Sequence, residues 1–184
     1  MTANRKRKLL IIVENLSVPF DRRVWRECIA LIEAGYQVSV ISPKGTICDK
    51  SKRETVRGAS IYRYRIYQSR GGLVSYLLEY FTALVMSAWL AIVVYVREGF
   101  DVIQICNPPD LLVFVALPFK LLGKKIIFDQ HDLSPEIYAM HKNGSNGGIV
   151  VRVLLFFERL TYLFSDIVIV VNECCRQIAL ERGG

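Results

Sequence analysis

The densest group of side chains able to do chemistry is a short polar run in the second half of the chain. Asp129, His131 and Asp132 lie within one four-residue stretch, and Glu136 follows shortly after. A carboxylate beside an imidazole can transfer protons, and both groups can hydrogen-bond the hydroxyls of a sugar. Turns are often polar, but a turn alone does not require so many titratable groups. We therefore predict a site for a polar substrate here.

The expected secondary structure places this run at the end of a strand. Residues 125–128 are expected to form a strand, and residues 9–13 form a short apolar run that is typical of a strand buried on both faces. Asn107 and Asp110 follow a similar strand at 102–106, and Asn15 follows the first strand of the chain. In an open parallel sheet, ligands bind at the carboxyl ends of the strands. These polar residues are therefore candidates for the same site.

The spacing of apolar residues predicts an α/β fold. In residues 21–34 they form one stripe at helical spacing, with a capping aspartate at the start and a glycine just after the end. Residues 60–67 alternate, which predicts a strand with one exposed face near a sheet edge, and 46–59 is expected to be a polar loop. The mostly alternating order indicates a Rossmann-like, doubly wound parallel sheet. The expected strands are 9–13, 36–41, 60–67, 102–106, 125–128 and 167–171, and the expected helices are 21–34, 73–96, 111–122, 149–164 and 173–182.

The loop after the first strand, residues 14–21, contains no glycine. A dinucleotide-binding turn would have the pattern G-x-G-x-x-G there, because its glycines let the backbone approach the pyrophosphate. The chain also has neither the phosphate-binding pattern G-x-x-x-x-G-K-[ST] nor the nucleophile pattern G-x-S-x-G. A dinucleotide-dependent oxidoreductase, a P-loop enzyme and an α/β-hydrolase are therefore unsupported.

The composition points to anionic partners and a reducing compartment. The chain of 184 residues has a net charge of +7, and residues 44–70 hold eight Lys or Arg against two acidic residues. Such a balance favours phosphates, anionic lipids or nucleic acid as partners. The five cysteines are odd in number and do not suggest a disulfide framework, which fits a reduced, cytosolic protein.

One apolar segment, residues 73–96, is long enough to span a membrane and carries a single charge, Glu79. A membrane span would interrupt the regular alternation of strands and helices, so we expect a buried or membrane-surface helix instead. Together with the apolar helix at 149–164 and the basic segment 44–70, it could form a docking face for an anionic membrane. Core packing against the sheet is the alternative for both helices.

Three motifs follow one another along the chain: VPFDRRVWRE at 18–27, NPPD at 107–110 and FDQHDLSPEIY at 128–138. They resemble motifs at the matching places of family-4 glycosyltransferases with the GT-B fold. A GT-B enzyme has two Rossmann-like domains that face a cleft, one for the acceptor and one for the nucleotide-sugar donor. The resemblance implies that residues 1–184 form the N-terminal, acceptor-side half of such an architecture, without the C-terminal donor-binding domain.

The same resemblance implies a retaining transfer of a hexose-type sugar. His131 matches the position where relatives place a histidine near the transferred sugar. The nucleotide sugar is a co-substrate, and no metal or other cofactor is expected. The implied catalytic residues are His131, Asp129 and Asp132, and the implied substrate-binding residues are Asn15, Asp21, Arg22, Asn107, Asp110 and Glu136.

The implied partners are the nucleotide sugar, a glycan or lipid-linked acceptor of cell-surface polysaccharide or glycolipid synthesis, an anionic membrane surface, and a donor domain in the same or a separate chain. Nucleic acid is not expected. The implied location is cytoplasmic, with a peripheral position at the inner face of the membrane. The chain alone is expected to be inactive, because both halves must surround the transferred sugar. Two alternatives remain: the domain of a GT-B nucleotide-sugar epimerase, and a noncatalytic binding remnant.

Overall fold

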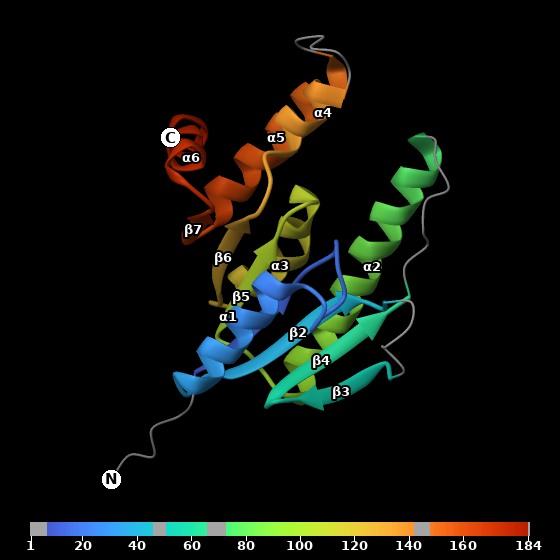
Figure 1. Ribbon diagram of the computed structural model, residues 1–184, viewed down its shortest axis with the longest axis vertical. Helices are drawn as coiled ribbons and strands as arrows, with labels where there is room; N and C mark the ends of the chain where they lie inside the picture. Colours follow the sequence, from blue (N-terminus) through green and yellow to red (C-terminus); the bar gives the residue numbers. More distant parts are fainter. Residues whose placement is uncertain (1–6, 46–50, 66–72, 142–147, 184) are drawn as a thin grey trace. The chain divides into compact units, whose positions relative to one another are not determined.

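The computed structural model describes residues 7–45, 51–65, 73–141 and 148–183, and it has the α/β fold that the sequence predicts (Figure 1). The sheet has seven strands among these residues, in the order β3-β4-β2-β1-β5-β6-β7. The chain divides into two compact units, residues 1–104 and 105–184.

The first unit is built on three parallel neighbours, β1, β2 and β4. Two helices, α1 and α2, pack against these strands, and Figure 1 shows α1 in front of them and α2 behind. With both faces covered, nearly all residues of the three strands are buried. The elements are β1 (Lys8–Ile12), α1 (Arg22–Glu33), β2 (Gln37–Pro43), β3 (Arg53–Val56), β4 (Ala59–Tyr64), α2 (Leu73–Arg97) and the start of β5 (Val102–Cys106).

Strand β3 corrects the prediction of a polar loop at 46–59. It runs antiparallel to β4 as the outer strand of the sheet. Arg57 and Gly58 join the two strands, and both have the positive φ that a two-residue hairpin turn requires (48° and 91°). Alternate residues of β3 are exposed, and the strand lacks the apolar run on which the prediction depended.

Strand β4 is an inner strand and not the half-exposed one that the sequence predicts. It lies between β2 and β3, and its Arg63 is buried in a salt bridge with Glu54 of β3 (2.6 Å). The pairing of Pro43 with Tyr64 extends β2 two residues beyond its predicted end at residue 41. Residues 66 and 67 of the predicted strand lie outside the described residues.

Helix α1 has the start and the end that the sequence predicts. The Asp21 side chain accepts hydrogen bonds from the backbone N–H groups of Arg23 and Val24 (both 3.1 Å), which satisfies two donors that have no partner within the helix. Gly35, just after the helix, has a φ of 89°, the left-handed conformation in which glycine commonly ends a helix.

The second unit contains two parallel strands, β6 and β7, and four helices among its described residues. Strand β6 runs two residues beyond its predicted end, so Asp129 and Gln130 belong to the strand. Helix α4 was not predicted. The elements are the end of β5, a 3₁₀ turn η1 (Asp110–Leu112), α3 (Val113–Leu121), β6 (Lys125–Gln130), α4 (Ser134–His141), α5 (Ile149–Phe164), β7 (Ile167–Val170) and α6 (Glu173–Gly183).

Candidate active site beside the ends of β5 and β6

The centre of the candidate site is a hydrogen-bonded pair, Asp129 and His131. Nε2 of His131 lies 2.8 Å from Oδ2 of Asp129, whose side chain is 2% exposed, while the imidazole is 17% exposed. An ionised carboxylate can only accept a hydrogen bond, so this contact keeps a proton on Nε2. Nδ1 is then the ring nitrogen that can accept from a substrate hydroxyl or take up a proton. The structure thus forms the carboxylate–imidazole pair that the sequence predicts.

Asn107 connects this pair to the end of β5. Its Oδ1 accepts hydrogen bonds from the backbone N–H groups of His131 (2.7 Å) and Asp132 (3.2 Å). Its Nδ2 donates to the backbone carbonyl of Asp132 (2.7 Å) and to Oδ1 of Asp110 (3.0 Å). Asn107 is buried, and these hydrogen bonds hold the backbone of His131 in position.

Asp110 is a buried acid beside Asn107. Burial raises the pKa of Asp110 from 3.8 to about 6, the amide of Asn107 opposes this shift, and the charge of Glu158 adds to it. The backbone carbonyl of Asp110 accepts a hydrogen bond from Oγ1 of Thr161 in α5 (3.0 Å). Asp110 can therefore change its protonation state near neutral pH while its backbone stays fixed.

A second polar cluster contains four residues that were not among the predicted site residues. Glu158 of α5 is fully buried and forms a salt bridge with Arg182 of α6 (2.7 Å). Gln130 donates to Glu158 (3.1 Å) and accepts from the hydroxyl of Tyr162 (3.0 Å). Burial raises the pKa of Glu158, and Arg182 partly offsets this effect. A lone acid on an otherwise apolar helix was the available signal for Glu158.

Glu136, a predicted substrate-binding residue on α4, also contacts Arg182 through a salt bridge. Arg182 therefore joins α4, α5 and α6 through two carboxylates. Asp132 is bound to Asn107 through its backbone alone in the contacts described, so its carboxylate has no role assigned by geometry. The catalytic role of Asp132 and the substrate contact of Glu136 stay predictions.

The predicted site residues of the first unit are Asn15, Asp21 and Arg22, all on or beside the loop between β1 and α1. Asn15 and Arg22 are exposed, whereas Asp21 is buried as the N-cap of α1. The middle of this loop is fastened at Val18. Its N–H donates to Oγ of Ser42 (3.3 Å), and its carbonyl accepts from the buried Arg63 (2.6 Å).

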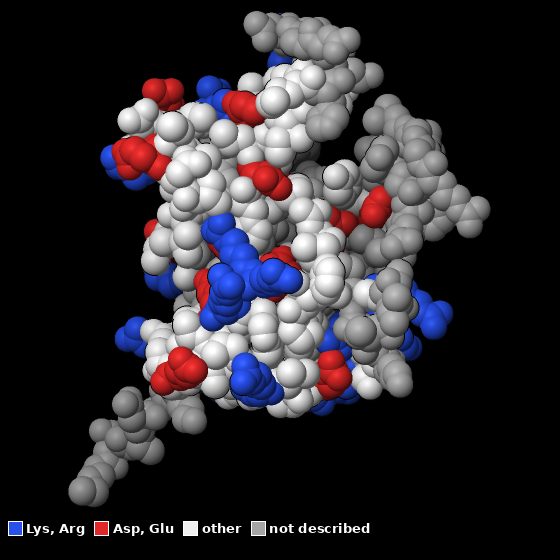
Figure 2. All heavy atoms as spheres, in the orientation of Figure 1, with Lys and Arg blue, Asp and Glu red and all other residues white. Residues whose placement is uncertain are grey.

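Basic side chains gather over the start of α1 in Figure 2, where Arg22, Arg23 and Arg26 are exposed. Three cations near a helix N-terminus are unfavourable for the helix dipole. An anionic ligand would relieve this repulsion. Directly after β1, Glu14 is buried, and burial together with the charge of Glu79 raises its pKa to about 7. Ser42, Arg63 and Glu14 are thus further residues near the loop that the prediction did not include.

Cys106, Asp129 and His131 offer three potential metal ligands within 4.8 Å of one another. The hydrogen bond between Asp129 and His131 already pairs two of them without a metal. We keep the metal-free interpretation as a prediction.

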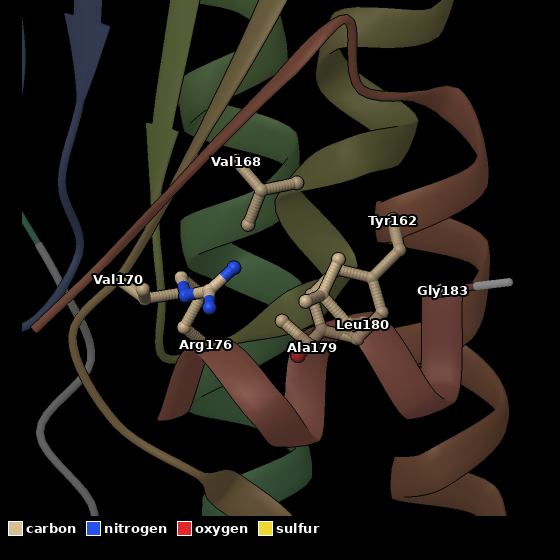
Figure 3. A pocket seen from close by; sticks show the side chains of 7 residues that line it. All are labelled: Tyr162, Val168, Val170, Arg176, Ala179, Leu180 and Gly183. Carbon is tan, nitrogen blue, oxygen red and sulfur yellow. The ribbon is translucent and has the colours of Figure 1, made fainter. Parts of the chain in front are cut away.

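A cavity of about 230 Å³ lies elsewhere in the second unit (Figure 3). Its wall is mostly apolar, and its charged member, Arg176, is paired with Glu173. A mostly apolar wall suits a sugar poorly, so the polar cluster around His131 is the better candidate site. The cavity is lined by Tyr162, Val168, Val170, Arg176, Ala179, Leu180 and Gly183.

Several solved structures share this fold. Sucrose-phosphate synthase from Thermosynechococcus elongatus aligns with a TM-score of 0.65 at 15% identity, over 96% of this chain and 45% of that chain. A structure described as trehalose-6-phosphate from E. coli, bound with UDP-2-fluoro glucose, gives 0.55 at 15% identity, over 95% and 42%. The catalytic domain of starch synthase IV from Arabidopsis thaliana, bound to ADP and acarbose, gives 0.53 at 16% identity, over 89% and 44%. The chain therefore spans less than half the length of these structures.

The fold is that of a Rossmann-like domain of the GT-B glycosyltransferases. A family model described as "Glycosyl transferase 4-like domain" matches residues 21–184, and the chain belongs to this family. No curated protein matches it by sequence. The family resemblance found from the three motifs is thereby confirmed, and it makes the chain a transferase domain by resemblance.

Proposed function

We propose that this chain is the N-terminal, acceptor-side half of a retaining glycosyltransferase. It would act with a donor-binding domain to transfer a hexose-type sugar from a nucleotide sugar to a glycan or lipid-linked acceptor in cell-surface polysaccharide or glycolipid synthesis. The observation that carries the proposal is the Asp129–His131 pair, held by Asn107 in a domain of the glycosyl transferase 4-like family.

His131 is the proposed catalytic residue. Its imidazole would hydrogen-bond a hydroxyl of the transferred sugar, or stabilise charge that develops as the bond to the nucleotide breaks. Asp129 would set the orientation and the protonated nitrogen of the ring, and Asn107 would hold the backbone under it. No metal is required for these steps, and the nucleotide sugar is the co-substrate.

The first unit is the proposed binding site for the acceptor. Arg22 and its two neighbouring arginines favour an anionic group, such as the phosphate of a lipid-linked acceptor. Asn15 lies exposed on the same loop and can hydrogen-bond a sugar or phosphate oxygen. A lipid-linked acceptor would place the protein at the cytoplasmic face of an anionic membrane, as a peripheral protein.

The test is His131→Ala in a longer protein that contains both halves, with turnover and thermal unfolding measured on the same sample. Loss of one transition-state hydrogen bond in a preorganised site should lower turnover by roughly a hundredfold. The unfolding temperature should fall as well, because the imidazole is 17% exposed and pairs with the buried Asp129 carboxylate, so turnover is compared at a temperature where both proteins are folded. The matched control is His141→Ala, which removes the other histidine of the chain.

Near-normal turnover in a destabilised His131→Ala protein would remove His131 from the site. Residues 1–184 alone should bind acceptor without transferring sugar. Measurable transfer by this chain in the absence of a partner would contradict its assignment as one half of the enzyme.

A further inference from the structure

Helix α2 has two faces of opposite character. Its inner face carries the small residues Ala83, Ser87 and Ala91, all fully buried, and the helix packs against β1, β2 and β4. Its outer face carries a stripe of exposed apolar side chains at helical spacing, in which Phe81 is 65% exposed and Trp89 61% exposed. We call this set the outer stripe: Leu78, Phe81, Val85, Trp89, Ile92 and Val96.

The outer stripe is long and continuous. From residue 78 to residue 96 it extends over roughly 27 Å, at 1.5 Å per residue. Contiguous apolar surface of this kind is rare on soluble monomers and marks a surface that binds something.

The end of α2 is fixed to the sheet through Glu98. The Glu98 carboxylate accepts hydrogen bonds from Ser39 of β2 (2.7 Å), from Arg53 of β3 (3.0 Å) and from the hydroxyl of Tyr62 in β4. Burial raises the pKa of Glu98, but these hydrogen bonds outweigh it and keep the pKa below its ordinary value. A helix so attached cannot leave the sheet to cross a bilayer without breaking buried contacts on its inner face.

The distribution of charge between the two units indicates what kind of partner this surface binds. The first unit contains sixteen Lys and Arg against nine Asp and Glu, whereas the second contains eight of each. The whole net charge of +7 therefore belongs to the unit that carries the outer stripe. Arg97 is exposed at the end of the stripe, whereas the half-exposed Arg53 near it is paired with Glu98. Exposed apolar side chains on a helix of a basic unit are the pattern of a helix that lies in the interface of an anionic membrane.

We propose that α2 docks the first unit onto an anionic lipid surface, with the outer stripe inserted in the plane of the interface and the small inner face still on the sheet. This inference rests on the proposed function with a lipid-linked acceptor, but its test does not require sugar transfer. The proposed docking surface is smaller than the docking face expected from the sequence. It leaves out α5, because α5 belongs to the unit without net charge.

The first measurement uses Trp89 as a probe. Trp25→Phe leaves Trp89 as the one tryptophan of the chain. Vesicles of phosphatidylglycerol and phosphatidylcholine should shift its emission to the blue, and lipids brominated near the headgroup should quench it more than lipids brominated near the bilayer centre. Vesicles of phosphatidylcholine alone should bind more weakly by at least about tenfold, because the electrostatic attraction is lost.

The second measurement is vesicle co-sedimentation of variants. Phe81→Gln with Trp89→Gln, on exposed positions, should weaken binding by at least about tenfold and leave the unfolding temperature unchanged. The matched control on α5 is Phe156→Gln with Leu163→Gln, also exposed, which should bind as the unchanged chain does.

Four results would overturn the proposal. The first is quenching that is strongest at the bilayer centre together with resistance to carbonate extraction, which indicates a membrane span. The second is loss of vesicle binding in the α5 control but not in the α2 variant. The third is vesicle binding that leaves Trp89 unquenched, and the fourth is a dimer that depends on the outer stripe and does not bind vesicles. If vesicle binding succeeds but His131→Ala retains full turnover, the proposed catalytic role fails and the docking surface stands.

Discussion

Replacing Asp110 with asparagine should make the chain more stable at neutral pH. The side chain is buried, and its pKa is raised from 3.8 to about 6, primarily because burial disfavours the charged form. A shift of about two units corresponds to about 3 kcal/mol of unfavourable free energy when the folded protein must hold Asp110 ionised. Asparagine has nearly the same shape, keeps the oxygen that accepts from Asn107 and carries no charge.

The sign of the effect follows from the two protonation states. Below about pH 4 the carboxyl is protonated in both the folded and the unfolded chain, so it imposes no penalty. Between about pH 4 and pH 6 the unfolded chain has lost the proton and the folded chain still holds it, so stability falls as the pH rises. Above about pH 6 the full penalty is present. Asp110→Asn should therefore match the unchanged chain at acid pH and exceed it by up to about 3 kcal/mol at neutral pH.

The assay is urea-induced unfolding of both proteins across this pH range, followed by circular dichroism. Asp166→Asn is a control of opposite sign. A backbone hydrogen bond from Ile126 is the main cause that lowers the pKa of Asp166 to about 2, so its loss should destabilise the chain at neutral pH and matter less in acid. If Asp110→Asn instead destabilises the chain at neutral pH and matters less in acid, as Asp166→Asn does, Asp110 is an ordinary ionised hydrogen-bond acceptor, and the reasoning from burial is refuted.

Two further substitutions test arginines that bind buried groups. Arg182→Ala should lower the free energy of unfolding, measured with urea, by about 3 kcal/mol, because it leaves the buried Glu158 carboxylate without its cation. The double variant with Glu158→Gln should recover part of this free energy. No loss on Arg182→Ala would show that Glu158 does not need this partner. Arg63→Met should speed hydrogen exchange of the backbone amides in residues 13–21, because the Arg63 guanidinium donates a hydrogen bond to the carbonyl of Val18 (2.6 Å). Unchanged exchange in these residues would show that Arg63 does not hold the loop in place.

The elements that the sequence predicts well are those whose own residues carry the signal. Helices α1 and α5 have apolar residues at helical spacing, and they appear within a residue of the expected bounds. Strand β3 was missed because it is a polar outer strand, defined by its pairing with β4 and by the turn at Arg57 and Gly58. Helix α4 was missed although Ser134, Pro135 and Glu136 form a common helix start, because that segment was interpreted as part of the polar site.

The candidate site shows the same division between local and long-range information. Asp129 and His131 are two residues apart on one strand end, so their contact could be expected from their spacing. The contact of Asn107 with the backbone of His131 joins residues 24 positions apart. The sequence indicated only that both residues follow strands whose carboxyl ends lie at the same edge of the sheet. The Glu158–Arg182 pair joins two helices, and no local pattern fixes which buried acid meets which cation.

The two units differ in net charge and therefore suit different chemical groups of a ligand. In the second unit two buried acids have local partners, in the pairs Asp129–His131 and Glu158–Arg182, Asp110 has only uncharged hydrogen-bond partners among the described residues, and the unit has no formal net charge. Such a site suits the neutral hydroxyls of a sugar, because it adds no long-range field to the hydrogen bonds. In the first unit the excess of cations attracts phosphate. The proposed lipid-phosphate-linked acceptor carries such an anionic group, whereas a neutral free glycan does not. Because salt screens exposed charges far more than buried pairs, added salt should weaken binding of that acceptor and leave the Asp129–His131 contact intact.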